Sequence, residues 1–168
     1  MQFCFILKAV MEKLDKLDIA ILKILQQDNF TPQRDIGQKI GLSAAAVQRR
    51  IKRMKAEGVI KRNISVLNRE KIGRPITLFV EVVMESEKAE YIDTTKAIFR
   101  STPEVQQCYY VTGDADFMLI IVVPTMHDYE LLTRRIFFGN NYIKHFRTMV
   151  AMDLVKVGLD VPLDAVTL

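Results

Sequence analysis

The chain has 168 residues, of which 49% are hydrophobic and 26% charged, and its net charge is +4. This composition is that of an ordinary soluble globular protein, and the length suits one domain or two small ones. The two cysteines, Cys4 and Cys108, have no metal-site spacing and exclude a disulfide framework, which favours a reducing, cytoplasmic environment.

The charge is divided unevenly along the chain. Residues 11–74 contain 15 Lys and Arg against 7 Asp and Glu, a net charge of +8, whereas residues 75–168 contain 8 against 13, a net charge of −5. This asymmetry indicates a front part that faces nucleic acid and a rear part with another task.

The first ten residues, Met1–Val10, are apolar but too short to span a membrane. They lack the small-residue cleavage motif of a signal peptide and run directly into a charged helix. We treat them as an extension and start the first domain at residue 11.

Three helices are predicted in the front part. Asp15 can cap a first helix that ends near Gln27. Thr31 is expected to cap a second helix with Pro32 in its first position, and Gly41 begins a tight corner before the third helix. Two helices joined by a short turn that contains glycine are typical of a helix-turn-helix motif.

The third predicted helix extends from the N-cap Ser43 to Gly58 and has two different sides. Val47, Ile51 and Met54 form one apolar stripe. The opposite side has small side chains in its first turn and basic side chains beyond it. A helix whose N-terminus enters the DNA major groove needs both features. Taken alone, the same pattern also fits a solvated basic face on a surface helix.

Residues 59–67 alternate apolar with polar or basic residues, which predicts an edge strand or wing. We therefore predict a winged helix-turn-helix DNA-binding domain over residues 11–67. The candidate contacts to base edges are Ala45, Ala46, Gln48 and Arg49, with Arg49 as the expected guanine contact. The candidate phosphate contacts are Arg50, Lys52, Arg53, Lys61 and Arg62, and the N-cap Ser43 completes the DNA-binding set.

A linker is predicted at residues 68–75 and a second domain at residues 76–168. Its predicted elements are the strand Ile76–Met84, the helix Glu87–Arg100, the strands Val105–Thr112 and Phe117–Val123, the helix His127–Phe138 and the strand Ile143–Met152. This order predicts a ferredoxin-like βαββαβ sandwich, and therefore an α+β chain.

The predicted strand Met118–Val123 is apolar without alternation, so both faces of its sheet need cover. Two helices can cover only one face. The sequence therefore predicts that a second copy covers the other face, and a homodimer in turn predicts operator half-sites with two-fold symmetry.

The chain resembles the Lrp/AsnC (leucine-responsive, feast/famine) family of transcription regulators over about residues 14–157. The resemblance is carried by Leu17-Asp18-x-x-Ile21-Leu22, Ile40-Gly41-Leu42-Ser43, Val47-x-x-Arg50-Ile51, Gly58-Val59-Ile60 and the hairpin Gly113-Asp114-Ala115-Asp116-Phe117. It implies cytoplasmic dimers that often assemble as octamers of four dimers. It also implies amino-acid effectors bound between dimers near the hairpin, and control of amino-acid metabolism genes.

The hairpin residues by themselves have the chemistry to bind a free amino acid. Gly113 permits close approach of the backbone to a carboxylate, and Asp114 and Asp116 supply negative charge for an ammonium. The same residues also suit an ordinary turn. A metal site at the two aspartates is a weaker interpretation, because no histidine or further carboxylate lies nearby in the sequence.

The family's effector pocket also draws on a segment after the second helix of the sandwich, and two further residues are candidates for it. Together these residues are Tyr110, Met126, Thr148, Met149, Val150 and Ala151. They are mostly apolar, and methionine adapts to varied ligand shapes, so we expect leucine or methionine as effector. Each of them also suits packing in the core.

Two other functions compete with regulation. Ferredoxin-like sandwiches also host catalysis, but the sequence contains no nucleophile–base order, metal cluster or phosphate loop around its two histidines, His127 and His145. We therefore expect neither an enzyme nor a cofactor. A nucleoid-packing protein with little gene specificity remains the nearer alternative, and specific footprints would distinguish the two.

Overall fold

The computed structural model describes residues 14–163, so the predicted extension at residues 1–10 lies outside the described residues. The described chain forms two compact units, one of residues 14–65 with residues 158–163 and one of residues 66–157. Residues 158–163 thus group with the front unit, whereas the sequence placed them in the rear domain.

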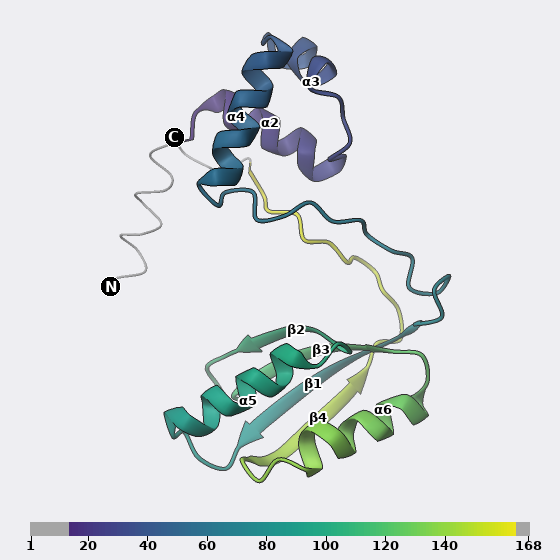
Figure 1. Cartoon of the computed structure of the whole chain (residues 1–168). Coiled ribbons are helices and arrows are strands. Elements are labelled where there is room, and N and C mark those ends of the chain that lie inside the picture. The colour runs from purple at the N-terminus through teal and green to yellow at the C-terminus, as the bar shows by residue number, and fades with distance from the viewer. Residues whose placement is uncertain (1–13, 164–168) are drawn as a thin grey trace. The chain divides into compact units, whose positions relative to one another are not determined.

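The first unit contains three helices, α2 (Lys16–Gln27), α3 (Gln33–Ile40) and α4 (Ala44–Ala56) (Figure 1). Its core is formed by one apolar residue from each of α2 and α3 and two from α4. These residues are Ile21, Ile36, Val47 and Met54, and each is fully buried. The apolar stripe predicted on the third helix therefore faces the other two helices, with Ile51 half-buried beside it.

Backbone geometry explains the sharp turn between α3 and α4. Gly41 has φ 74°, a conformation that residues with a side chain rarely adopt. The turn passes close to Gly37 of α3, and a Cβ added there would come within 2.3 Å of the Leu42 carbonyl oxygen. Ser43 then starts α4, because its hydroxyl accepts a hydrogen bond from the Ala46 amide at 3.2 Å.

The expected role of Thr31 as a helix cap is wrong. Its hydroxyl donates to the Asp28 carbonyl at 2.9 Å, so it closes the preceding turn. Pro32 occupies the cap position of α3 and Gln33 is the first helical residue, with no side chain accepting from the first turn. The capping predicted for α2 is confirmed, because Asp15 accepts from the amide of Asp18 at 2.8 Å.

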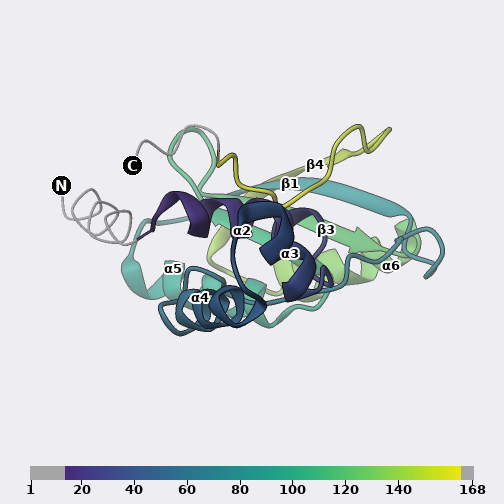
Figure 2. The ribbon, with the colours of Figure 1, turned by 90° about the horizontal axis from the view of Figure 1, so that it is seen from above.

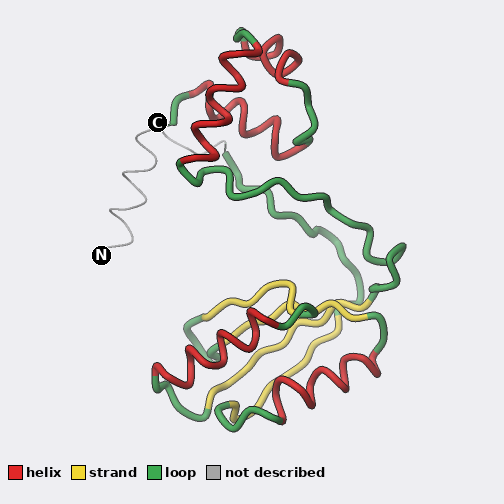
Figure 3. Tube along the Cα trace, in the orientation of Figure 1, coloured by secondary structure: helices red, strands yellow, loops and turns green. Residues whose placement is uncertain are grey.

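The strand predicted for residues 59–67 is also wrong. No strand precedes Ile76 in the part of the chain that the structure describes, and residues 59–67 are drawn as loop in Figure 3. Val59 and Ile60 pack against the first unit's core, and the Ile60 amide donates to the Met54 carbonyl at 3.2 Å. Beyond them Val66 and Leu67 are exposed. An alternating segment forms a stable strand only when it pairs with other strands, and this segment pairs with none among the described residues.

The second unit is a four-stranded antiparallel sheet with helices on one face (Figure 1). Its elements are β1 (Ile76–Met84), α5 (Ala89–Ser101), β2 (Val105–Tyr110), β3 (Phe117–Val123), α6 (Met126–Thr133), the π-helical turn η1 (Arg134–Phe138) and β4 (Ile143–Val150). The strand order is β2-β3-β1-β4. Figures 1 and 2 both show β4 beside β1. The predicted ferredoxin-like arrangement is confirmed.

Alternate residues of the two central strands face α5 and α6. Phe117, Leu119 and Ile121 of β3 are fully buried there, and the Phe99 ring of α5 meets the Phe117 ring edge-on at 5.5 Å. The intervening residues of β3, such as Ile120, are only partly buried. Burial thus alternates along a strand whose sequence does not, because no described element of the second unit covers the second face.

The predicted linker is partly built into the second unit. Residues 68–74 form a compact turn, in which the Asn68 carbonyl accepts from the Ile72 amide at 3.2 Å. Arg69 donates to the Thr77 hydroxyl at 2.9 Å and to the Gln106 amide oxygen at 2.7 Å, so this turn is attached to the sheet.

Candidate nucleic-acid interface and ligand site

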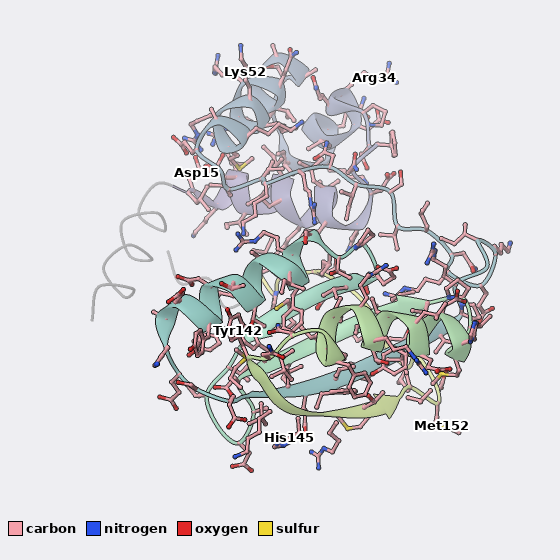
Figure 4. All side chains as sticks on the ribbon, turned by 60° about the horizontal axis from the view of Figure 1, so that its bottom comes forward. Asp15, Arg34, Lys52, Tyr142, His145 and Met152 are labelled. Carbon is pink, nitrogen blue, oxygen red and sulfur yellow. The ribbon has the colours of Figure 1, made fainter. Side chains whose placement is uncertain are left out.

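The outward side of α4 carries the residues predicted to meet base edges. Ala45, Gln48 and Arg49 are exposed, and Ala46 is partly buried. Figure 4 shows Lys52 at the outer edge of the unit, pointing away from it. Small residues in the first turn of a helix, with cations one turn later, let the backbone approach a groove while the cations reach phosphates.

Two of the residues predicted to contact phosphates form ion pairs within the unit. Arg50 donates to the carboxylates of Asp15 at 2.7 Å and Asp18 at 2.9 Å, and Arg53 donates to Asp18 at 2.5 Å. The Asp18 carboxylate is fully buried. Arg50 lies about 60° from Val47 around the helix, so its side chain leaves α4 beside the apolar stripe.

These contacts shift the pKa values of Asp15 and Arg50. The amide of Asp18, and then the guanidinium of Arg50, lower the pKa of the Asp15 carboxyl below its ordinary value. Hydrogen bonds to Asp15 and Asp18 raise the pKa of Arg50. The sequence analysis identified Asp15 as a helix cap and Asp18 as part of a family motif, but it did not predict their pairing with arginines of the third helix.

Lys61 and Arg62 follow Ile60 directly in an exposed, irregular segment. They therefore lie close to the end of α4 in sequence, but no strand fixes their direction. Their predicted phosphate contacts depend on the backbone beyond Ile60, which makes few hydrogen bonds to hold it.

The two predicted aspartates of the hairpin between β2 and β3 differ in their exposure and hydrogen bonding. Asp116 is tied to the sheet, because its carboxylate accepts from the Met84 amide at 2.8 Å and its own amide donates to the Val82 carbonyl at 2.9 Å. Asp114 is exposed, and Gly113 beside it has φ 126°. Tyr110 packs its ring on Phe117 at 5.2 Å.

The remaining predicted effector residues extend from the middle of the sheet, where Thr148 pairs with Val80 of β1, to the end opposite the hairpin. Met126 begins α6, just after β3 ends, and Ala151 donates to the Thr77 carbonyl at 2.9 Å near the start of β1. Because β3 has seven residues, about 20 Å of strand separates Met126 and Ala151 from the hairpin. Within one chain the structure does not bring the two groups together.

The residues of β4 also differ in the face they present. Thr148 points toward the helices, where its hydroxyl shares a 2.5 Å hydrogen bond with the Tyr129 hydroxyl. Burial raises the pKa of Tyr129, although the bond to Thr148 opposes this shift. Val150 pairs with the helix-facing Leu78, whereas Met149 pairs with Phe79 on the opposite face. Consecutive strand residues cannot all line one pocket.

A shallow cavity of about 510 Å³ lies elsewhere in the second unit. It is lined by Phe137, Phe138, Asn140, Asn141, Ile143, Lys144, His145 and Phe146. None of the predicted effector residues lines it. Among the described residues, no group of three His, Cys, Asp or Glu side chains could hold a metal ion, and no helix is long and apolar enough to cross a bilayer.

Comparison with known proteins gives matches in both units. Residues 14–61 match a family model described as winged helix-turn-helix DNA-binding, and residues 77–160 match one described as the Lrp/AsnC ligand binding domain. An uncharacterised HTH-type transcriptional regulator of Sinorhizobium fredii, y4tD, is 44% identical over 152 residues, which are 90% of each chain.

Two further proteins extend this likeness. The leucine-responsive regulatory protein of Haemophilus influenzae is 32% identical, over 85% of this chain and 86% of its own length. The crystal structure of an AsnC family transcriptional regulator from Agrobacterium tumefaciens superposes with a TM-score of 0.85 at 32% identity, over 90% of this chain and 98% of that one.

Proposed function

This chain belongs to the Lrp/AsnC family of transcriptional regulators, and from this premise we propose that it binds specific operators and controls genes of amino-acid metabolism in response to an amino acid. It is a regulator and not an enzyme. The observation that carries the proposal is the outward side of α4, where Arg49 and Lys52 are exposed next to a first turn of alanines.

The positions of Arg49 and Lys52 on α4 support contacts to base edges as well as to phosphates. Arg49 projects from the half of the helix nearer its N-terminus, which is the end that reads bases in a helix-turn-helix complex. Lys52 lies one turn further on, where a phosphate contact is expected. A guanidinium contact to guanine contributes discrimination between sequences, whereas a lysine–phosphate contact contributes salt-dependent affinity.

We also propose that the protein works as a homodimer that assembles further, as an octamer of four dimers. The uncovered face of the sheet carries partly buried and exposed apolar side chains from all four strands. They are Phe79, Val83, Tyr109, Met118, Ile120, Val122 and Met149. This face is largely apolar, with one ion pair between Glu81 and Arg147 on it, and its apolar residues favour burial against a second copy.

The separation of the predicted effector residues supports a site shared between copies. The hairpin and Met126 lie at opposite ends of β3, so both could meet one ligand only if they came from different chains. The exposed Asp114 is the carboxylate available to an ammonium, since Asp116 is engaged with the Met84 amide. Leucine or methionine is the proposed effector, in keeping with the name of the leucine-responsive relative.

Selection from a random DNA library, followed by titration with amino acids, tests the proposal. We expect the purified chain to enrich a short two-fold symmetric duplex and to prefer it over random duplex at physiological salt. Calorimetric titration should show heat with leucine or methionine and none with lysine, and Asp114→Asn should weaken that heat more than Asp128→Asn.

Two results would contradict parts of this proposal. Uniform coverage of random duplex without enrichment would favour the alternative, a nucleoid-packing protein. Binding of lysine with leucine and methionine silent would exclude the apolar effector while leaving the DNA-binding proposal intact.

A further inference from the structure

Asp18 is a fully buried carboxylate on α2 that binds two arginines of α4. Its oxygens accept from Arg50 at 2.9 Å, from Arg53 at 2.5 Å and from the backbone amide of Asp15 at 3.1 Å. A carboxylate removed from water needs such partners, and here they all come from the first unit. The contact between α2 and α4 is therefore polar as well as apolar.

Four of the five cations of α4, all except Lys55, fall into two pairs that differ in direction. Arg50 and Arg53 are three residues apart and lie on the same side of the helix, turned toward Asp18. Arg49 and Lys52 have the same spacing but precede that pair by one residue, so they project about 100° away around the axis. Both are exposed, and no ion pair involves either within residues 14–163.

This arrangement makes the rotation of α4 depend on Asp18. The residues Val47 and Met54 are fully buried on one side of the helix, and apolar burial is a non-directional interaction. Charge-assisted hydrogen bonds are short and directional, so the bonds to Arg50 and Arg53 restrict that rotation more tightly. The direction in which Arg49 leaves the helix is fixed by the same bonds.

We propose that Asp18 is a positioning residue for DNA reading: it orients α4 so that Arg49 and Lys52 face the groove, and it withholds Arg50 and Arg53 from the phosphates. The inference rests on the proposed DNA binding and deepens it. Asp18 itself touches no DNA. It determines which of the basic residues of α4 do so.

The slope of log affinity against log salt concentration measures how many cations contact phosphates, because each contact changes this slope by about 0.9. The test uses the full chain, a random-sequence duplex and a duplex that the wild-type protein selects from a random library. We expect Asp18→Asn to steepen the slope on random duplex, since it releases Arg50 and Arg53. It should also reduce the preference for the selected duplex about tenfold, since Arg49 is no longer fixed.

Asp35→Asn is the matched control, because it removes an equal charge from an exposed carboxylate on α3 whose partner, Arg34, is exposed as well. It should leave the preference for the selected duplex within about twofold of wild type. A folded Asp18→Asn protein that matches this control in slope and preference would overturn the proposal and leave Asp18 a structural role alone.

Arg50→Gln keeps the inference testable if Asp18→Asn does not fold, because Arg53 still pairs with Asp18 in this variant. Its slope should equal that of wild type, whereas a fall of about 0.9 would show that Arg50 contacts a phosphate and would overturn the proposal. If the wild-type chain bound neither duplex, the proposed function would fail first and the role of Asp18 in DNA reading with it.

Discussion

At the scale of single residues, Asp15 both caps α2 and forms an ion pair with Arg50 of α4. Its carboxylate accepts from the amide of Asp18 and from Arg50, and these bonds lower its pKa below the ordinary value of 3.8. A carboxyl whose folded-state pKa is depressed stabilises the fold above its unfolded pKa and loses that contribution as pH falls through the folded value. The first unit should therefore lose stability below about pH 4.

Asp15→Asn tests this dependence, since asparagine also caps helices but does not titrate. We expect the urea midpoint of the variant, followed by circular dichroism, to fall less than that of wild type as pH is lowered from 5 toward 2. Asp15→Ala should instead be less stable at every pH, because it lacks the cap. Parallel curves for wild type and Asp15→Asn would show that the Asp15 charge does not stabilise the fold.

At the scale of elements, the turn between α3 and α4 depends on Gly37. Alanine is normally favoured over glycine within a helix by about 1 kcal/mol. At Gly37 the added Cβ would meet the Leu42 carbonyl oxygen at 2.3 Å, so backbone would have to move. We expect Gly37→Ala to destabilise the first unit by about 1–3 kcal/mol, as overpacking does.

Gly158→Ala is the control for this prediction, because a Cβ there would meet nothing within 4 Å. Urea unfolding should show little change for Gly158→Ala and a lower midpoint for Gly37→Ala. Equal or greater stability of Gly37→Ala would mean that the turn can shift to accept a side chain.

The outcome for individual elements shows what the sequence could predict. The bounds of β1 and β3 and the cap at Ser43 are those predicted, because hydrophobic patterns and cap chemistry are local properties. Residues 59–67 have the pattern of a strand but no partner, and pairing is not local. The continuation of α6 as the π-helical turn η1 was also not visible in the sequence pattern.

The candidate site was predictable only in part for a similar reason. Helical spacing identified the outward side of α4, but spacing alone could not show that a buried Asp18 binds Arg50 and Arg53 from another helix. Likewise, the predicted effector residues were distant in sequence, and only the strand pairing and register show how far along the sheet they lie from the hairpin.

At the scale of the whole molecule, the uncovered sheet face predicts association. Ile120 lies on this face in the central strand β3, paired with Phe79 of β1. A charge at this position would be buried without a partner in a dimer that packs these faces together, at a cost of several kcal/mol. We therefore expect Ile120→Glu to shift the protein toward monomer, measured by light scattering.

Leu131→Glu is the matched control, because Leu131 is 52% exposed on α6 in the other layer of the sandwich. It should leave the mass of the dimer unchanged. A wild-type chain that is monomeric at all concentrations, or an Ile120→Glu variant with unchanged mass, would contradict association through this face.

The central claim is that the outward side of α4 reads DNA, and the affinity of Arg49→Gln for the selected and random duplexes tests it most directly. Arg100→Gln, on the exposed side of α5, is the control with the same change of charge. We predict that Arg49→Gln loses most of the preference for the selected duplex, by about five- to a hundredfold, while Arg100→Gln retains it. Equal preference in both variants and wild type would contradict the account.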